Sequence, residues 1–199
     1  MDVVLASNNP GKLKELQETL APLKLRLLSQ AEFDFPEAIE DGLSFVENAI
    51  IKARHASRHT GLPALADDSG LEVDALHGEP GIYSARYAGL NQDRDSNDRA
   101  NNRLVLEKLK AVPESERTAR FHCVIALTRF ANDPMPLICQ GSWEGRISFE
   151  ERGNFGFGYD AIFYLPAHDC NSAELEPAVK NTLSHRAKAI QELLKHWPL

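Results

Sequence analysis

Two adjacent carboxylates, Asp67 and Asp68, are the first candidates for chemistry in this sequence. They follow the apolar residues 64–66, which resemble the end of a buried strand, and precede Ser69-Gly70, a pair typical of turns. Carboxylates at a strand end lie where α/β proteins commonly place their chemistry, and Mg²⁺ prefers one or two carboxylates together with substrate phosphates. The alternative is a polar turn in which Asp68 or Ser69 caps backbone amides.

A phosphate site is a second candidate, near the N-terminus. A polar run separates the apolar residues 3–6 from leucines at helical spacing, so the pattern predicts strand, loop and helix. Asn9 would cap the helix, with Pro10 at its first position. Free amides at such a helix start attract phosphate, and Lys12 adds positive charge. The segment lacks the P-loop spacing, and a capped helix without a ligand is the alternative.

A third candidate is a lysine on the next predicted helix. Ser44-Phe45-Val46-Glu47 has the form of a capping box and opens a helix that should reach about His59. Asn48 and Lys52 lie four residues apart and would share its polar face. A helical lysine can equally face water without any function.

Aromatic and basic residues in the C-terminal third are the remaining candidates. Residues 153–160 are rich in glycine and aromatics, which suits either stacking on a base or a tight turn with core aromatics. Ser184-His185-Arg186 begins the last predicted helix, over residues 184–196. His185 and Arg186 would read a base or a phosphate there, or would be solvated surface residues.

These candidates are positioned by alternating strands and helices, so the expected class is α/β. Further strands are expected over residues 25–28, 71–76 and 161–165, and residues 119–130 and 136–147 should form a β-hairpin. A hairpin in a βα chain favours a mixed sheet. Residues 93–102 are read as a solvated helix or loop without chemistry. We expect one domain over residues 1–199, built as two lobes, with the hairpin contributing to the second.

Composition restricts the partners. The 199 residues carry a net charge of −7, which argues against binding nucleic-acid backbone by bulk electrostatics. No apolar run reaches membrane-spanning length, and the N-terminal residues lack the pattern of a signal peptide. Three cysteines, an odd number without CxxC spacing, suggest reduced thiols and a cytoplasmic protein.

Taken together, these segments resemble one family, and the resemblance runs from Val3 to the last helix. The motifs are Ser7-Asn8-Asn9-Pro10-Gly11-Lys12, Phe45-Val46-Glu47-Asn48-Ala49 with Lys52-Ala53, Ala66-Asp67-Asp68-Ser69-Gly70-Leu71, Pro80-Gly81-Ile82-Tyr83-Ser84-Ala85-Arg86-Tyr87, Phe157-Gly158-Tyr159-Asp160 and Ser184-His185-Arg186. Each is modest alone, but their joint order is similar to that of the Ham1/RdgB family of inosine and xanthosine triphosphate pyrophosphatases.

The resemblance implies a homodimeric, Mg²⁺-dependent hydrolase with a long mixed β-sheet, flanking helices and two lobes around a cleft. Such enzymes cleave dITP, ITP and XTP to the monophosphate and pyrophosphate, which keeps deaminated purines out of RNA and DNA. Phosphoanhydride hydrolysis needs positioning and cations more than covalent chemistry. Hard oxygen ligands make zinc an unsuitable metal for the site.

The resemblance also assigns roles to residues. Asp68 would bind the metal with Glu40 and act as the general base, supported by Asp67. The triphosphate would be held by Ser7, Asn8, Asn9, Pro10, Gly11 and Lys12, with Lys52 neutralising its charge and Ser69 touching the substrate. The base pocket would comprise Phe157, Gly158, Tyr159, Asp160, Lys180, His185 and Arg186.

The chain departs from the family pattern at two places. Phe155 stands where many relatives have a small glycine, which could alter the base pocket, and residues 93–102 form a slightly longer stretch than expected, at the cleft rim or surface. Two rival functions are a Maf-like pyrophosphatase of pyrimidine or modified nucleotides and a nucleotide-binding protein without hydrolytic activity. The Phe157-Gly158-Tyr159-Asp160 and Ser184-His185-Arg186 segments argue against the first rival. The intact set of Glu40, Lys52 and Asp68 argues against the second.

Overall fold

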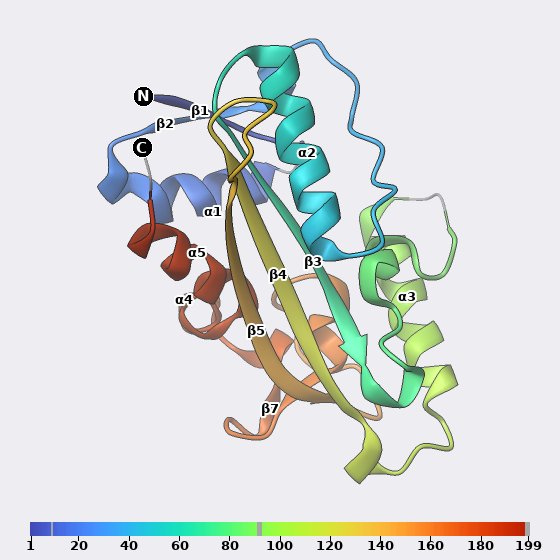
Figure 1. The fold of residues 1–199 in the computed structure, drawn as a ribbon. Coiled ribbons are helices and arrows are strands. Elements are labelled where there is room, and N and C mark those ends of the chain that lie inside the picture. The colour runs from blue at the N-terminus through green and yellow to red at the C-terminus, as the bar shows by residue number, and fades with distance from the viewer. Residues whose placement is uncertain (9, 91–92, 198–199) are drawn as a thin grey trace. The chain divides into compact units, whose positions relative to one another are not determined.

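The computed structural model describes residues 1–8, 10–90 and 93–197, and its centre is a seven-stranded sheet of order β2-β1-β3-β4-β5-β6-β7 (Figure 1). β1 is parallel to β2 and β3, whereas β6 is antiparallel to β5 and β7. The sheet is therefore mixed, as predicted. Its strands are β1 (Asp2–Leu5), β2 (Arg26–Ser29), β3 (Ala64–Val73), β4 (Thr118–Thr128), β5 (Leu137–Ile147), β6 (Phe163–Leu165) and β7 (Cys170–Asn171).

Helices flank this sheet, which confirms the expected α/β class. They are α1 (Pro10–Leu20), α2 (Phe45–Thr60), α3 (Arg94–Lys108), α4 (Pro177–Leu183) and α5 (His185–Lys195). Helix α4 carries Lys180. Within the described residues, no helix combines the length and apolar character that crossing a membrane requires.

The chain divides into two compact units. The first comprises Met1–Asp68, Cys123–Gly141 and Ala189–Leu199, and the second comprises Ser69–His122 and Ser142–Lys188. Strands β3, β4 and β5 each contribute residues to both units. Asp68 is the last residue of the first segment, and Ser69 follows it in the same strand.

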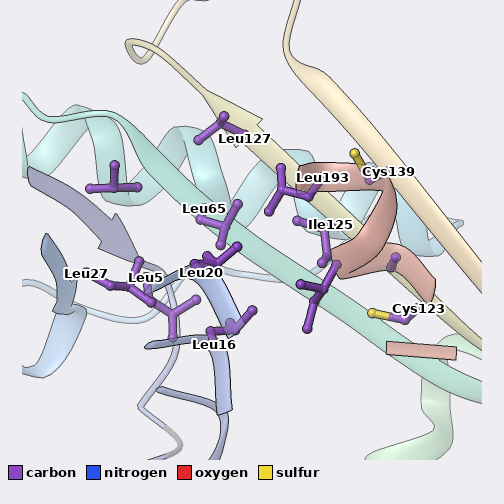
Figure 2. Packing of buried hydrophobic residues seen from close by; sticks show 13 residues of the cluster. Leu5, Leu16, Leu20, Leu27, Leu65, Cys123, Ile125, Leu127, Cys139 and Leu193 are labelled. Atoms are coloured by element: carbon purple, nitrogen blue, oxygen red, sulfur yellow. The ribbon is translucent and has the colours of Figure 1, made fainter. Parts of the chain in front are cut away.

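Side-chain alternation along the strands of the first unit separates two apolar layers. Val3, Leu5 and Leu65 face a cluster completed by residues of α1 and α5, among them Leu16, Leu20 and Leu193 (Figure 2). Val4, Ala64 and Ala66 alternate with them and pack against Ala49, Ala53 and Ala56 of α2. Successive strand residues point to opposite faces of a sheet. In β3, position 67 therefore belongs to the face of α1 and position 68 to the face of α2.

The second unit has its own core. Leu71 and Val73 of β3 are fully buried and pack with Val105 of α3 and with Leu109, the residue directly after that helix. Phe163 and other apolar side chains from residues 119–165 complete this cluster. The buried stripe of α3 fixes which of its faces points inward, and this orients the polar residues on the neighbouring face.

The predicted turn at Ser69-Gly70 was wrong, because β3 continues through both residues to Val73. Gly70 is buried, and the amide of Leu71 donates to Ser84 Oγ over 2.9 Å, so polar groups are satisfied in the extended conformation. Burial of the apolar side chains of Leu71 and Val73 then stabilises the strand beyond Gly70. Asp67 and Asp68 therefore lie inside a strand and not at its tip.

The predicted hairpin strands are neighbours, and Asp133 organises their connection. Its side chain is 1% exposed and accepts from Arg129 Nε at 2.8 Å and from the amides of Arg129 and Met135 at 3.0 Å. The hydrogen bonds from Arg129 hold the pKa of Asp133 well below its ordinary value. The carboxylate thus ties the two ends of the loop together.

We expect Asp133→Asn to destabilise the protein by about 1–3 kcal/mol at pH 7, because the new amide hydrogens would face donors. A carboxylate whose folded-state pKa is lowered stabilises the fold above its unfolded pKa, near 4, and loses this contribution as the pH falls through the folded value. Urea unfolding at pH 7 and pH 3 should therefore show that the free energy of unfolding differs between wild type and variant, and that this difference is smaller at pH 3. A difference of equal size at both pH values would contradict this role.

Candidate active site

Asp67 and Asp68 each meet a lysine from the helix on their own face of β3. Lys12 Nζ of α1 donates to both oxygens of Asp67, at 2.9 and 2.8 Å, and Asp67 is almost fully buried. Lys52 Nζ of α2 donates to Asp68 Oδ1 at 2.9 Å. A one-residue step along a strand thus sends two carboxylates to two different cations.

Lys52 also contacts Glu40, so one ammonium bridges two carboxylates. The distance from Lys52 Nζ to Glu40 Oε2 is 3.2 Å, and the side chains of Lys52 and Asp68 are 14% and 13% exposed. The solvated alternative for Lys52 is excluded by this burial. Formal charges leave one net negative charge on the three groups, together with carboxylate oxygens that are hard ligands.

The electrostatics of this trio favour proton acceptance by Asp68. Burial raises the pKa of the Asp68 carboxyl, and this effect, reinforced by Glu40, exceeds the lowering by Lys52 and by the Asn48 amide. Burial by itself lowers the pKa of Lys52, but Asp68, Asp67 and Glu40 together outweigh burial and raise it. Lys52 therefore stays a cation while Asp68 becomes a stronger base than an exposed aspartate.

Glu40 is brought to this place by the segment before α2, residues 33–43. Phe35 stacks on His59 of α2 with ring centroids 5.0 Å apart, and His55 Nε2 lies 2.7 Å from the carbonyl oxygen of Pro36. Further along, the amide of Gly42 donates to Asn48 Oδ1 at 2.9 Å. Contacts on both sides of Glu40 thus attach this acidic segment to the helix that carries Lys52.

A cleft of about 280 Å³ lies beside these charges. Its lining comprises Ala6, Ser7, Asn8, Lys12, Gln30, Glu37, Ala38, Glu40, Lys52 and Asp67. The Asn8 amide donates to the Glu37 carboxylate. Pro10 and Gly11 form the start of α1, and the predicted cap Asn9 lies outside the described residues. The cleft is therefore polar and lies where strand β1 passes into helix α1.

The second unit holds the predicted base-pocket residues, organised by Asp160. Its Oδ2 accepts from the amide of Phe157 at 2.9 Å and from Lys180 Nζ, and its Oδ1 accepts from Ser172 Oγ at 2.9 Å. Gly156 has φ +81°, and a Cβ there would meet Asp160 Oδ2 at 2.1 Å. Glycine is required at position 156 by both its backbone conformation and the approach of Asp160.

Phe157 is 45% exposed, and three cations surround its ring. The guanidinium of Arg94 lies 4.2 Å from the ring centroid, Lys180 Nζ lies 5.4 Å away, and the guanidinium of Arg186 lies 5.9 Å away. An electron-rich ring face attracts cations at such distances. The combination offers a stacking surface next to several hydrogen-bond donors.

His185 and Arg186 are both buried at the start of α5, which rules out the alternative of a solvated pair. The His185 ring stacks on Phe121 with centroids 4.8 Å apart. Tyr159 is also buried, and its hydroxyl donates to the carbonyl oxygen of Ser84 at 2.7 Å, so it packs in the core. Ser69 is half-buried in β3.

Helix α3 contains residues that the sequence analysis missed, because residues 93–102 were read as carrying no chemistry. Asp98 accepts from the amide of Gly158 at 2.7 Å, and Asn102 Nδ2 donates to the carbonyl oxygen of Gly158 at 3.2 Å. Asn101 and Asn102 are buried. The recurrence of polar residues at positions 94, 98 and 102 was the available signal, since that spacing marks one helix face.

The fit of a divalent metal is decided by the donor set of Glu40 and Asp68. The described residues contain no group of three His, Cys, Asp or Glu side chains arranged to hold a metal. Two carboxylates that already share one cation nevertheless suit Mg²⁺, which takes few protein ligands and fills its shell with water and phosphate oxygens. The arrangement fits Mg²⁺ better than a metal that needs a complete protein cage.

Comparisons with known proteins agree with this picture. The model of the Ham1 family matches residues 3–196. A dITP/XTP pyrophosphatase of Vibrio parahaemolyticus is 56% identical over 191 residues, covering 96% of this chain and 94% of that protein. One from Thioalkalivibrio sulfidiphilus is 56% identical over 195 residues, covering 98% and 97%.

A solved structure shares the fold as well as the sequence. The HAM1 protein of Coxiella burnetii superposes with a TM-score of 0.92 at 53% identity, covering 98% of this chain and 97% of that one. The residues matched by the family model, 3–196, include residues of both units and the positions of every motif described above. This chain belongs to the Ham1 family.

Proposed function

We propose that this protein hydrolyses deaminated purine nucleoside triphosphates, namely dITP, ITP and XTP, to the monophosphate and pyrophosphate. The observation that carries the proposal is the bridging of Glu40 and Asp68 by Lys52, beside a polar cleft. The names of its relatives, which share more than half of their residues with it, support the same activity.

The residues of the first unit are assigned to the phosphates. Lys12 and Lys52 supply positive charge, and the polar segment from Ser7 to Gly11, which leads into α1, supplies hydrogen-bond donors other than the N–H that Pro10 lacks. Glu40 and Asp68 would hold Mg²⁺. When bound, this ion would offset the negative charge of the phosphates and lower the pKa of a coordinated water. Asp68 takes the proton of the attacking water.

The residues of the second unit are assigned to the base. Phe157 offers its ring for stacking, and Lys180, His185 and Arg186 offer donors for the O6 acceptor of a 6-oxo purine. Asp160 is engaged by Phe157, Lys180 and Ser172. We therefore assign it to orienting Lys180 and the loop and leave the N1–H group of the base to a neighbouring backbone carbonyl.

A panel of nucleotides tests the function. Purified protein with Mg²⁺ is incubated with dITP, ITP, XTP, GTP, ATP and a pyrimidine triphosphate, and pyrophosphate and free phosphate are measured separately. We expect pyrophosphate from the first three, much less from GTP and least from ATP. Preference for a pyrimidine would support the Maf-like alternative, and binding without product release would support a non-catalytic binder. EDTA should abolish turnover, and Mg²⁺ should restore it.

The assembly and location complete the proposal. We propose a homodimer that works in the cytoplasm on free nucleotides, without nucleic-acid or membrane partners. The net charge of −7 supports the lack of affinity for nucleic acid. Light scattering coupled to size-exclusion chromatography measures the mass directly, and a mass near 22.1 kDa would show a monomer instead.

Replacing either lysine should separate phosphate handling from base reading. We expect Lys12→Ala and Lys52→Ala each to lower kcat/KM for ITP by at least about tenfold while the ITP-to-GTP ratio stays constant, because a lysine acts on phosphate as a point charge. Lys110→Ala, on an exposed position, is the control for loss of one positive charge. A changed ratio with unchanged efficiency on ITP would argue against the assignment.

A further inference from the structure

The backbone of Gly158, next to the half-exposed ring of Phe157, is held on both sides by helix α3. Its amide donates to Asp98 Oδ2 at 2.7 Å, and its carbonyl oxygen accepts from Asn102 Nδ2 at 3.2 Å. Both polar groups of one residue are thus fixed by side chains one helical turn apart. Gly158 has φ +63°, a left-handed conformation that glycine adopts readily and that these two contacts maintain.

The third contact is made by Arg94, which lies one turn before Asp98 on the same face of α3. Its guanidinium lies 4.2 Å from the centroid of the Phe157 ring and 4.0 Å from Asp98 Oδ2. Because these residues recur at every fourth position, one face of a single helix contacts both the ring and the following peptide. On the other side, the amide of Phe157 is held by Asp160.

These contacts have little to do with the stability of the core. Phe157 and Arg94 are 45% and 51% exposed, so hydrophobic burial does not fix the position of the ring, and exposed ionic contacts contribute little to folding. Asn102 Oδ1 is buried with no donor among the described residues, which costs free energy. The burial of the Asn102 side-chain amide is therefore better explained by the hydrogen bond that its Nδ2 donates to Gly158 than by a contribution to stability.

We propose that Arg94, Asp98 and Asn102 are positioning residues that set base discrimination by fixing the ring of Phe157 and the peptide after it. This inference rests on the proposed function, because it assumes that Phe157 stacks on the purine. Hypoxanthine and guanine both carry O6 and N1–H and differ only at the 2-position. Xanthine carries an oxygen there, so a substituent of that size fits, and guanine is refused because its 2-amino donor finds no acceptor. A ring that can shift would let this amino group reach water, whereas a fixed ring would keep it unpaired.

The test measures kcat and KM for ITP and GTP with two variants and their matched controls. Arg94→Ala removes the contact with the ring, and Asp98→Asn weakens the bond to Gly158. Arg99→Ala and Asp95→Asn change the same residue types at exposed positions of the same helix. We expect Arg94→Ala to raise KM for ITP about three- to tenfold with kcat nearly unchanged and to change KM for GTP less, so that the ITP-to-GTP ratio of kcat/KM falls. Asp98→Asn should lower the ITP-to-GTP ratio of kcat/KM about tenfold, and the controls should match wild type.

The outcomes separate this inference from the function on which it rests. Variants that keep the wild-type ITP-to-GTP ratio of kcat/KM would overturn the inference, even if KM for both nucleotides changed together. Wild-type protein that releases no pyrophosphate from ITP would overturn the proposed function instead. If Asp98→Asn fails to fold, Arg94→Ala decides the question, because its exposed side chain can be removed without disturbing the core. Arg94→Lys, which keeps a cation over the ring, should recover part of the loss in KM.

Discussion

Asp68→Asn should lower kcat for ITP by at least about 10²-fold while the protein remains folded. The side chain lies in β3 on the face of α2, with Oδ1 bonded to Lys52. An asparagine keeps its shape and still accepts that hydrogen bond, so the strand and the lysine should stay in place. It cannot take up a proton from water, and its single neutral oxygen is a poor substitute for a carboxylate at a metal.

We would measure kcat for ITP by steady-state kinetics on the purified variant in the presence of Mg²⁺. Thermal unfolding would establish that the variant is folded. Asp41→Asn is the matched control, because Asp41 is an exposed carboxylate next to Glu40 on the same segment. It should retain wild-type turnover. Near-wild-type turnover in Asp68→Asn would remove this residue from the catalytic role and leave Glu40 as the carboxylate to examine.

Arg186→Ala should have the second largest effect, on the choice of base. Hypoxanthine presents an acceptor at O6 and a donor at N1, and adenine reverses both. A pocket that donates to O6 and excludes water rejects adenine because mismatched polar groups stay unpaired, and such sites discriminate by up to about 10⁴-fold. Arg186 is buried, and its guanidinium lies 5.9 Å from the Phe157 ring centroid. Its removal should lower kcat/KM for ITP more than for ATP, and so reduce the preference for ITP over ATP.

Parallel kinetics with ITP and ATP measure this ratio. Lys195→Ala is the control on the same helix, because Lys195 is exposed in the last turn of α5 and pairs with Glu192. It removes one positive charge without touching the aromatic region and should leave the ratio unchanged. If Arg186→Ala also kept the wild-type ratio, Arg186 would not read the base, and its role would lie with the phosphates or with the structure.

The sequence by itself determined the class of the fold and the identity of the charged groups. The continuous apolar run at residues 3–6 and the helical spacing of leucines after Lys12 were sufficient to predict β1, α1 and the loop between them. In the sequence, Phe45, Ala49, Ile50 and Ala53 recur at helical spacing, and this pattern alone indicates the face of α2 that packs in the core. These features depend on neighbours within a few residues, so local patterns carry them.

Only the tertiary structure decided how those groups are paired. Asp67 and Asp68 are adjacent in sequence, yet one meets Lys12 and the other meets Lys52, because β3 continues through Ser69 and sends them to opposite faces. A local reading favoured a turn at that point, since Ser-Gly is typical of turns, and the buried residues that extend the strand gain their stability from distant parts of the chain.

The contacts of α3 could not be predicted from the sequence either, because they join residues that are far apart along the chain. Asp98 and Gly158 are 60 residues apart, and nothing in a polar run near Asp98 indicates which peptide it will hold. The burial of Val105 and Leu109 fixes the rotation of the helix, and that rotation turns Arg94, Asp98 and Asn102 toward residues 157 and 158. Residue types set the available chemistry, whereas packing of distant apolar residues decided which of these groups meet.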